Sequence, residues 1–108
     1  MSAAEVRVVL VTAPDAGAGA RIARALVEER LAACVNLVPG VRSTYRWQET
    51  LQEDDEVLLV IKTVEGRLEA LTERVRALHP YDLPEVLALA VAGGSADYLA
   101  WLRGEAAP

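Results

Sequence analysis

The sequence predicts a single α+β domain in which strands and helices follow the order β-α-β-β-α-β, with one more helix at the C-terminal end. Three observations lead to this prediction. The chain has 108 residues, the usual size of one domain. Apolar, Val-rich runs typical of buried strands occur at four places, and segments with apolar residues at helical spacing lie between them. We see no repeat, linker or low-complexity stretch, so residues 1–108 are expected to form one domain.

Residues 5–12 (EVRVVLVT) are rich in Val and are typical of a central strand buried on both faces. The Ala-Pro-Asp sequence at 13–15 ends this strand, and the side chain of Asp15 is a suitable N-cap for a helix. Over residues 19–31 the apolar positions recur at helical spacing, with charged residues on the other side. We therefore expect a strand followed by an amphipathic helix.

The next segment predicts a long hairpin. Residues 34–38 form a short apolar run and residues 41–48 alternate in period two, so we expect one strand with a bend at the Pro-Gly pair between them. Residues 49–55 (ETLQEDD) are polar and acidic and are expected to form the hairpin tip; they lack the ligand spacing of a calcium loop. Residues 56–63 (EVLLVIKT) are typical of another buried strand.

The last third predicts a helix, a strand and a final helix. Residues 68–78 carry apolar side chains at helical spacing, and Pro80 ends this helix because the residue before a proline is pushed out of helical geometry. Residues 85–91 (EVLALAV) are expected to form the fourth strand. A short helix follows over 95–103, with a serine as its N-cap and Gly104 as its stop.

This order of elements is the split βαβ, or ferredoxin-like, arrangement. Both inner helices are expected to cover the same face of the sheet, which leaves the other face without a cover from its own chain. Because the strands are nearly continuous apolar runs, we expect another subunit to cover that face.

Composition and charge limit the possible partners. The net charge is −5, with 16 acidic against 11 basic residues, which argues against nucleic-acid binding because that depends on clustered positive charge. The single cysteine excludes an internal disulfide and fits a reducing cytoplasm. The first residues lack a basic targeting signal, and no apolar run approaches the ~20 residues of a membrane span. We expect a soluble cytoplasmic protein.

The residue patterns of common catalytic sites are missing. Gly17-Ala18-Gly19 stands where a dinucleotide-binding loop begins, but Ile22 occupies the third glycine position. We see no Ser-His-Asp set, paired carboxylates or phosphate loop, so we do not expect an enzyme. Cys34 and His79 could form a catalytic dyad only if the fold brings them together, which the sequence leaves open. The alternative interpretation is that Cys34, which lies in an apolar run, is simply a small buried hydrophobic residue.

The segment 79–85 (HPYDLPE) has the richest chemistry. Its two prolines stiffen a stretch that holds an imidazole, a phenol and two carboxylates, and a stiff loop loses little order on binding a ligand. Histidine is a common ligand of copper and zinc. The alternative is a helix stop whose polar groups face water.

Lys62, the only lysine, ends a predicted buried strand, so its ammonium group reaches either solvent, a carboxylate or an anionic ligand.

Several separate motifs, in one order over residues 5–103, resemble the CutA divalent-cation-tolerance family. They are Ala33-Cys34-Val35-Asn36, Ser43-Thr44-Tyr45 with Trp47, Ile61-Lys62-Thr63, His79-Pro80-Tyr81 with Pro84-Glu85, and Tyr98-Leu99 with Trp101-Leu102. The resemblance implies a ferredoxin-like homotrimer, similar in architecture to PII signalling proteins, whose long hairpin embraces a neighbouring subunit.

The resemblance also implies candidate site residues. Cys34 and His79 match the family's suggested metal ligands. A ligand-binding cleft between subunits would involve Trp47, Lys62, Tyr81 and Glu85. The family pattern has a second aromatic residue where this chain has Arg46, which weakens the case for an aromatic cage.

Three functions follow as hypotheses. The first is a non-catalytic homotrimer for divalent-cation tolerance that binds or responds to divalent metal ions such as copper or zinc, without an obligatory cofactor. The second is a PII-like sensor of a small anionic or zwitterionic effector, bound near Lys62 and Glu85. The third is a stable trimeric scaffold for another protein. Neither nucleic acid nor a membrane is an expected partner.

Overall fold

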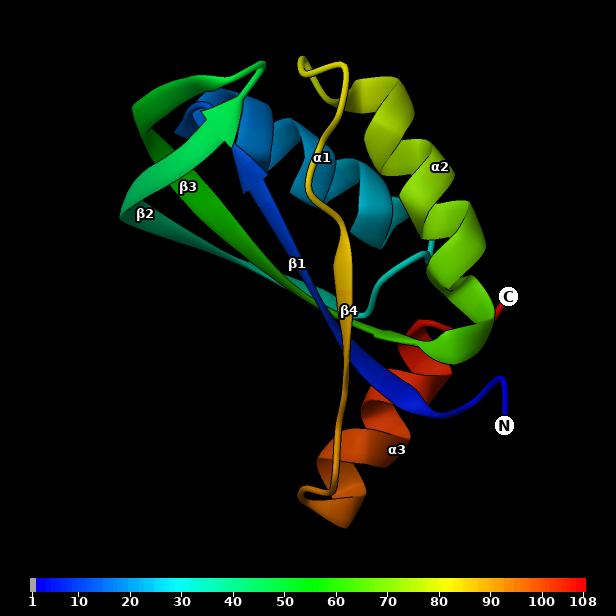
Figure 1. The fold of residues 1–108 in the computed structure, drawn as a ribbon. Coiled ribbons are helices and arrows are strands. Elements are labelled where there is room, and N and C mark those ends of the chain that lie inside the picture. The colour runs from blue at the N-terminus through cyan, green and yellow to red at the C-terminus, as the bar shows by residue number, and fades with distance from the viewer. Residues whose placement is uncertain (1) are drawn as a thin grey trace.

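The computed structural model of the chain describes residues 2–108, and Met1, which belongs to the predicted domain, lies outside the described residues. The described part forms a four-stranded antiparallel sheet with three α-helices (Figure 1). The elements are β1 (Val6–Ala13), α1 (Ala16–Glu28), β2 (Cys34–Trp47), β3 (Thr50–Val64), a short 3-10 helix η1 (Glu65–Arg67), α2 (Leu68–Leu78), β4 (Leu87–Ala90) and α3 (Ala96–Glu105). This order along the chain confirms the predicted β-α-β-β-α-β order with a final helix. Across the sheet the strands lie in the order β2-β3-β1-β4.

Helices α1 and α2 cover one face of the sheet, as the sequence predicts. Alternate residues of the two central strands point toward these helices, because successive side chains of a strand point to opposite faces. Val9 and Val11 of β1 lie opposite Ile61 and Leu59 of β3, and all four side chains are fully buried. They pack against the apolar side chains of the two helices, including Ile22, Leu26, Leu71 and Val75.

The other face of the sheet, which we call the open face, is apolar but only partly covered. Val8 and Leu10 of β1 pair with Lys62 and Val60 of β3, and Leu58 follows Val60 on the same face of β3. The four apolar side chains among these residues are half-buried. On the neighbouring strand β4, Leu87 and Leu89 are exposed. Helix α3 covers only one end of this face, where Leu102 and Ala106 pack against Val6, Ala33 and Val64.

The hairpin tip differs from the prediction. Only Gln48 and Glu49 form the turn, both with positive φ (49° and 66°), and β3 begins directly after them at Thr50. Two residues with positive φ give the turn twist that suits a tight hairpin. The predicted acidic tip at 49–55 was therefore wrong. Its polar residues lie in a strand that projects into solvent, and opposite charges pair across the ladder there, as Arg42 does with Asp55 at 3.1 Å.

Most other element boundaries agree with the sequence. Asp15 is the N-cap of α1 and accepts a hydrogen bond from the Ala18 amide at 2.8 Å, although α1 begins at Ala16, earlier than the apolar spacing indicated. Helix α2 has the predicted bounds, and strand β4 is shorter than predicted. The predicted stop of the last helix at Gly104 was wrong: α3 continues to Glu105. Its last turn is held because the backbone N–H of the buried Ala106 donates a hydrogen bond to the Leu102 carbonyl at 3.0 Å.

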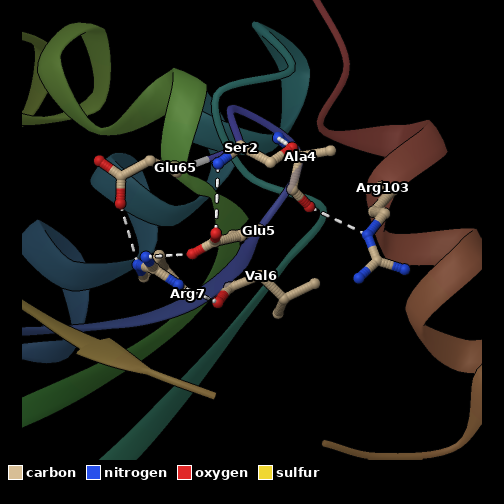
Figure 2. Close-up of polar contacts among 7 residues, drawn as sticks. All are labelled: Ser2, Ala4, Glu5, Val6, Arg7, Glu65 and Arg103. Carbon is tan, nitrogen blue, oxygen red and sulfur yellow. Dashed lines mark hydrogen bonds and ion pairs between the residues drawn. The ribbon is translucent and has the colours of Figure 1, made fainter. Parts of the chain in front are cut away.

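The N-terminal segment is tied to the end of the sheet that α3 covers (Figure 2). Arg7 contacts Glu5 at 2.7 Å and Glu65 at 3.0 Å, and the hydrogen bond from Arg7 lowers the pKa of Glu5. Arg103 of α3 donates to the Ala4 carbonyl at 2.9 Å. These contacts connect the start of the chain to both η1 and α3. No helix within residues 2–108 is long and apolar enough to span a bilayer.

Candidate functional site

A cavity of about 690 Å³ lies where the end of β1, the hairpin and the loop after α2 meet. We call it the pocket. Its walls come from three separate parts of the chain, so only the tertiary structure assembles it. The lining residues are Thr12, Ser43, Thr44, Tyr45, Trp47, Glu56, Pro80, Tyr81, Asp82, Leu83 and Glu85.

His79 fixes the loop that forms one wall of the pocket. It is the C-cap of α2, with extended backbone (φ −77°, ψ 138°), as expected for a residue before proline. Its Nδ1 accepts a hydrogen bond from the Tyr81 amide at 3.1 Å, and its Nε2 lies 2.7 Å from the Thr12 carbonyl oxygen. Because an amide only donates and a carbonyl only accepts, the ring carries its proton on Nε2 and its lone pair on Nδ1. The side chain is buried and both nitrogens are engaged.

Tyr81 connects this loop to strand β3. Its ring packs against His79 with centroids 4.7 Å apart, and its hydroxyl donates to Glu56 Oε2 at 2.9 Å. Burial raises the pKa of the Tyr81 phenol, and the hydrogen bond to Glu56 raises it further, so the phenol remains a donor at neutral pH. Glu56 itself is only 7% exposed.

A second carboxylate, Glu85, lies on the other side of the loop. Burial raises the pKa of Glu85, and the nearby charge of Glu56 raises it further. Because the charge of Glu56 acts on Glu85, the two carboxylates lie close enough to repel, and a positive charge between them would be favoured. The pocket is therefore a region of negative potential.

Of the four residues expected in a cleft, the structure brings Trp47, Tyr81 and Glu85 together on the pocket and places Lys62 elsewhere. Lys62 lies inside β3, two residues before its end, and its Nζ donates to Asn36 Oδ1 on β2. It lies on the open face, opposite Cys34 in the β2–β3 ladder. The pocket lining contains no lysine, arginine or histidine.

Cys34 and His79 lie apart within one chain. His79 bonds to Thr12, which pairs with Leu58 on β3, whereas Cys34 pairs with Lys62, four residues further along β3. Four residues of strand span about 13 Å. Cys34 is a half-buried free thiol, and its Sγ is 4.0 Å from Asn36 Oδ1. Among residues 2–108, no group of three or more His, Cys, Asp or Glu side chains is arranged to hold a metal ion.

Sequence reasoning missed two participants in the site. Glu56 was placed at the start of the predicted strand 56–63 and given no role in a site, although its even spacing from Lys62 along that strand already placed both on the same face. The role of the Thr12 carbonyl could not be predicted from the sequence, because every residue has a backbone carbonyl and no residue type marks this one as an acceptor. Its role depends on where the loop after α2 crosses the end of β1.

The chain was compared with known families and proteins. The sequence model of a family described as CutA1 divalent ion tolerance protein matches residues 7–105. A relative from Thermus thermophilus, named divalent-cation tolerance protein CutA, is 56% identical over 96 residues, which cover 89% of this chain and 93% of that protein. A chloroplastic CutA protein from Arabidopsis thaliana is 54% identical over 96 residues, again 89% of this chain but 53% of the plant protein.

Solved structures agree with the fold. The structure of a divalent cation tolerance protein, Cut A1, from Thermus thermophilus superposes with a TM-score of 0.91 at 54% identity. The superposition covers 93% of this chain and 97% of that one. The CutA1 structure from Oryza sativa also gives a TM-score of 0.91, at 51% identity, and covers 94% of this chain and 93% of the rice chain.

Proposed function

This chain belongs to the CutA1 divalent ion tolerance protein family, and on that premise we propose that it acts in divalent-cation tolerance as a non-catalytic homotrimer that binds or responds to divalent metal ions, copper foremost. The observation that carries the proposal is the family match over residues 7–105, nearly the whole chain. The Thermus thermophilus relative, named for divalent-cation tolerance, supports it over 93% of its own length.

The open face supports the homotrimer. Val8, Leu10, Leu58 and Val60 form a continuous apolar surface at the centre of the sheet, and no helix within residues 2–108 packs on that centre. Burying apolar surface stabilises an assembly by roughly 25 cal/mol per Å². A second copy of the chain has the same apolar face and is the cover that we propose.

The assembly matters for metal binding because a single chain offers too few ligands. Cys34 is a soft ligand of the kind that copper prefers, it is half-buried, and it lies on the open face. His79 fits less well, because both of its ring nitrogens are engaged and a metal could bind only if the Tyr81 amide or the Thr12 carbonyl were released. We therefore propose Cys34 as the primary ligand and His79 as a second one, with further ligands from other copies.

Charge also favours cations. Three copies of a chain with net charge −5 give −15, and a negative field raises the local concentration of cations. A non-catalytic role is supported by the state of His79, the only histidine, because an imidazole with both nitrogens engaged is not free to act as a general base.

We further propose that the protein acts in the cytoplasm. The support is the single free cysteine, which a reducing compartment keeps as a thiol. One relative is named as chloroplastic, so family membership alone leaves the compartment open. Separation of cell fractions with an antibody against the protein tests the location, and recovery from any other compartment would contradict it.

Titration calorimetry with Cu²⁺ and Zn²⁺ tests the metal proposal. We expect wild-type protein to bind Cu²⁺, and Cys34→Ala to weaken this binding at least tenfold. His79→Ala is expected to weaken it less, and Cys34→Ser shows whether an oxygen ligand can replace sulfur. Ser43→Ala, in the pocket, is the matched control and should bind Cu²⁺ like wild type. Equal Cu²⁺ isotherms for wild type and Cys34→Ala would remove the proposed ligand.

A further inference from the structure

The start of the chain is bonded to two elements that are far from each other in the sequence. Residues 2–5 form a turn, closed by a hydrogen bond from the Glu5 amide to the Ser2 carbonyl at 3.1 Å. We call these residues the N-terminal turn. It lies between η1 and α3, and each of its other carbonyl groups accepts a hydrogen bond from one of these two elements (Figure 2).

The N-terminal turn completes the start of η1. The first amides of a helix have no partner inside the helix, and a side chain at the N-cap usually accepts from one of them. Val64, the N-cap residue of η1, makes no such side-chain bond. Instead, the Glu65 amide donates to the Glu5 carbonyl and the Gly66 amide donates to the Ala3 carbonyl, both at 2.8 Å. The turn therefore replaces a capping side chain.

The turn and η1 are also in close contact. A Cβ on Gly66 would lie 3.0 Å from the Ala3 Cβ and 3.2 Å from the Ala3 carbonyl oxygen, which is closer than ordinary van der Waals contact. Arg7 adds a charged connection, because it contacts Glu5 of the turn at 2.7 Å and Glu65 of η1 at 3.0 Å. Charge-assisted hydrogen bonds are stronger than neutral ones. The turn is therefore held firmly on η1.

Helix α3 has few other attachments within its own chain. Its ten residues are fewer than the roughly 12–15 that an isolated helix needs, and Leu102 is the only one of them that is buried in the described chain. Leu102 and the following Ala106 pack on apolar side chains at the end of the sheet. The ion pair between Glu105 and Arg30 at 3.3 Å is exposed, and such pairs contribute little. The hydrogen bond from Arg103 to the N-terminal turn, at 2.9 Å, is shorter than this ion pair.

We propose that the N-terminal turn is a strap that couples α3 to η1, so that its release opens α3 while the rest of the fold stays intact. The main core lies on β1, β3, α1 and α2, and it contains no residue of the turn, η1 or α3. Peripheral units of this kind open at a lower free-energy cost than the whole protein. Release of the strap uncovers Val6, Ala33 and Val64, on which α3 packs. The proposal concerns contacts within one chain and does not depend on the proposed function.

Native-state hydrogen exchange, measured by NMR, tests the coupling from the η1 side. Gly66→Ala crowds Ala3 and should lift the turn from η1. The reporter is the Ala106 amide in the last turn of α3, which donates to the Leu102 carbonyl. We expect its exchange to accelerate at least about tenfold. Gly104→Ala is the matched control, because a Cβ there meets nothing within 4 Å, and it should not accelerate the Ala106 amide although it lies in α3 itself.

The reverse experiment starts from α3, since coupling between two sites is reciprocal. Arg103→Met removes the donor to the Ala4 carbonyl and keeps most of the apolar stem. The reporter is the Glu65 amide, which the turn caps, and its exchange should accelerate at least about threefold. Arg24→Met removes an arginine from the exposed side of α1 and should leave the Glu65 amide unchanged.

Two further results would support the strap. Ala3→Gly in the Gly66→Ala background removes the nearer of the two crowded atoms, and it should restore part of the protection of the Ala106 amide. Combining Gly66→Ala with Arg103→Met should accelerate the Ala106 amide by less than the product of the single effects, because a released strap has nothing more to lose. The paired amides of β1 and β3 should exchange as in wild type in every variant.

Three outcomes would overturn the proposal. Gly66→Ala could accelerate only amides of η1 and leave the Ala106 amide at its wild-type rate, which would mean that other contacts, including those to another copy, hold α3. Arg103→Met could act on α3 alone, which would make its bond to the turn a local one. Equal acceleration of the β1–β3 amides and the Ala106 amide would show that α3 opens only when the whole protein unfolds.

Discussion

The two faces of the sheet are built from alternate residues of the same strands, yet they differ in how they are stabilised. On β3, Leu59 and Ile61 are fully buried under α1 and α2, whereas Leu58 and Val60 on the open face are only half-buried. The helix-covered face is complete within one chain. The open face is as apolar, but within residues 2–108 only α3 covers it, and only at one end. If another copy covers the rest, as we propose, strand alternation divides one short segment between folding and assembly.

The largest loss of folding stability is expected from a substitution on the helix-covered face. Leu59→Ala leaves a cavity among fully buried side chains and should lower the free energy of unfolding by about 2–5 kcal/mol. Leu51→Ala is the control, because Leu51 is 61% exposed near the hairpin tip and should cost less than about 0.5 kcal/mol. Urea unfolding measures both. Similar costs for the two variants would contradict the contrast between a sealed core and an exposed hairpin.

A charge on the open face should act on assembly more than on folding. Val60→Lys places an ammonium group at the centre of this face, and we expect it to weaken self-association at least about a hundredfold, since an unpaired charge is costly in an apolar interface. Light scattering should give the mass of three chains for wild type and of one chain for the variant.

Ala70→Lys adds the same charge on the exposed side of α2 and is expected to keep the wild-type mass. Circular dichroism should be the same for all three proteins. A Val60→Lys protein that still has the mass of three chains would place the subunit interface on another surface, and a one-chain mass for wild type would remove the trimer.

A smaller effect is expected at His79, which joins the pocket loop to β1. His79→Ala leaves the Thr12 carbonyl and the Tyr81 amide without their partner, and should lower the free energy of unfolding by about 1–3 kcal/mol. Hydrogen exchange of the Tyr81 amide should accelerate in the variant. Cys34→Ala, at the other end of the open face, is expected to cost less. Unchanged exchange at Tyr81 would show that the loop is held by other contacts.

The smallest expected effect is on the pH dependence of folding stability, which should have opposite signs at Glu85 in the pocket and at Glu5 near the N-terminus. The pKa of Glu85 is raised by burial and by the charge of Glu56, so folding stability should fall as the pH rises from the usual carboxylate pKa through this higher value. The other titratable groups that line the pocket with Glu85 are Tyr45, Glu56, Tyr81 and Asp82. Glu85→Gln should remove this decrease.

Glu5 should show the opposite sign. Its pKa is lowered by the hydrogen bond from Arg7, so its contribution is present above the usual carboxylate pKa and is lost as the pH falls through the lower value. Urea unfolding of wild type, Glu5→Gln and Glu85→Gln from about pH 3 to about pH 7 measures both slopes. Slopes of the same sign would mean that at least one of the two environments is misassigned.

The order of elements, the helix bounds of α2 and the N-cap at Asp15 were predictable because each depends on local periodicity or on a single capping residue. The hairpin tip was not, because the polar stretch 49–55 looks like a turn by composition, while its strand geometry comes from pairing with β2. Of the expected cleft, Trp47, Tyr81 and Glu85 meet on the pocket, whereas the position of Lys62 depends on which residues of β2 and β3 lie opposite each other.

The sequence by itself determined the family, the alternation of strands and helices, and an apolar sheet face that needs a cover, since all of these are written in residue types and their spacing. The tertiary structure decided the chemistry of the pocket. It placed Lys62 outside the pocket and Glu56 in it, engaged both nitrogens of His79, and left Cys34 apart from His79. The physical reason is that charge and metal ligation act over a few ångströms, and distances between distant segments are set by strand register and loop packing rather than by local sequence.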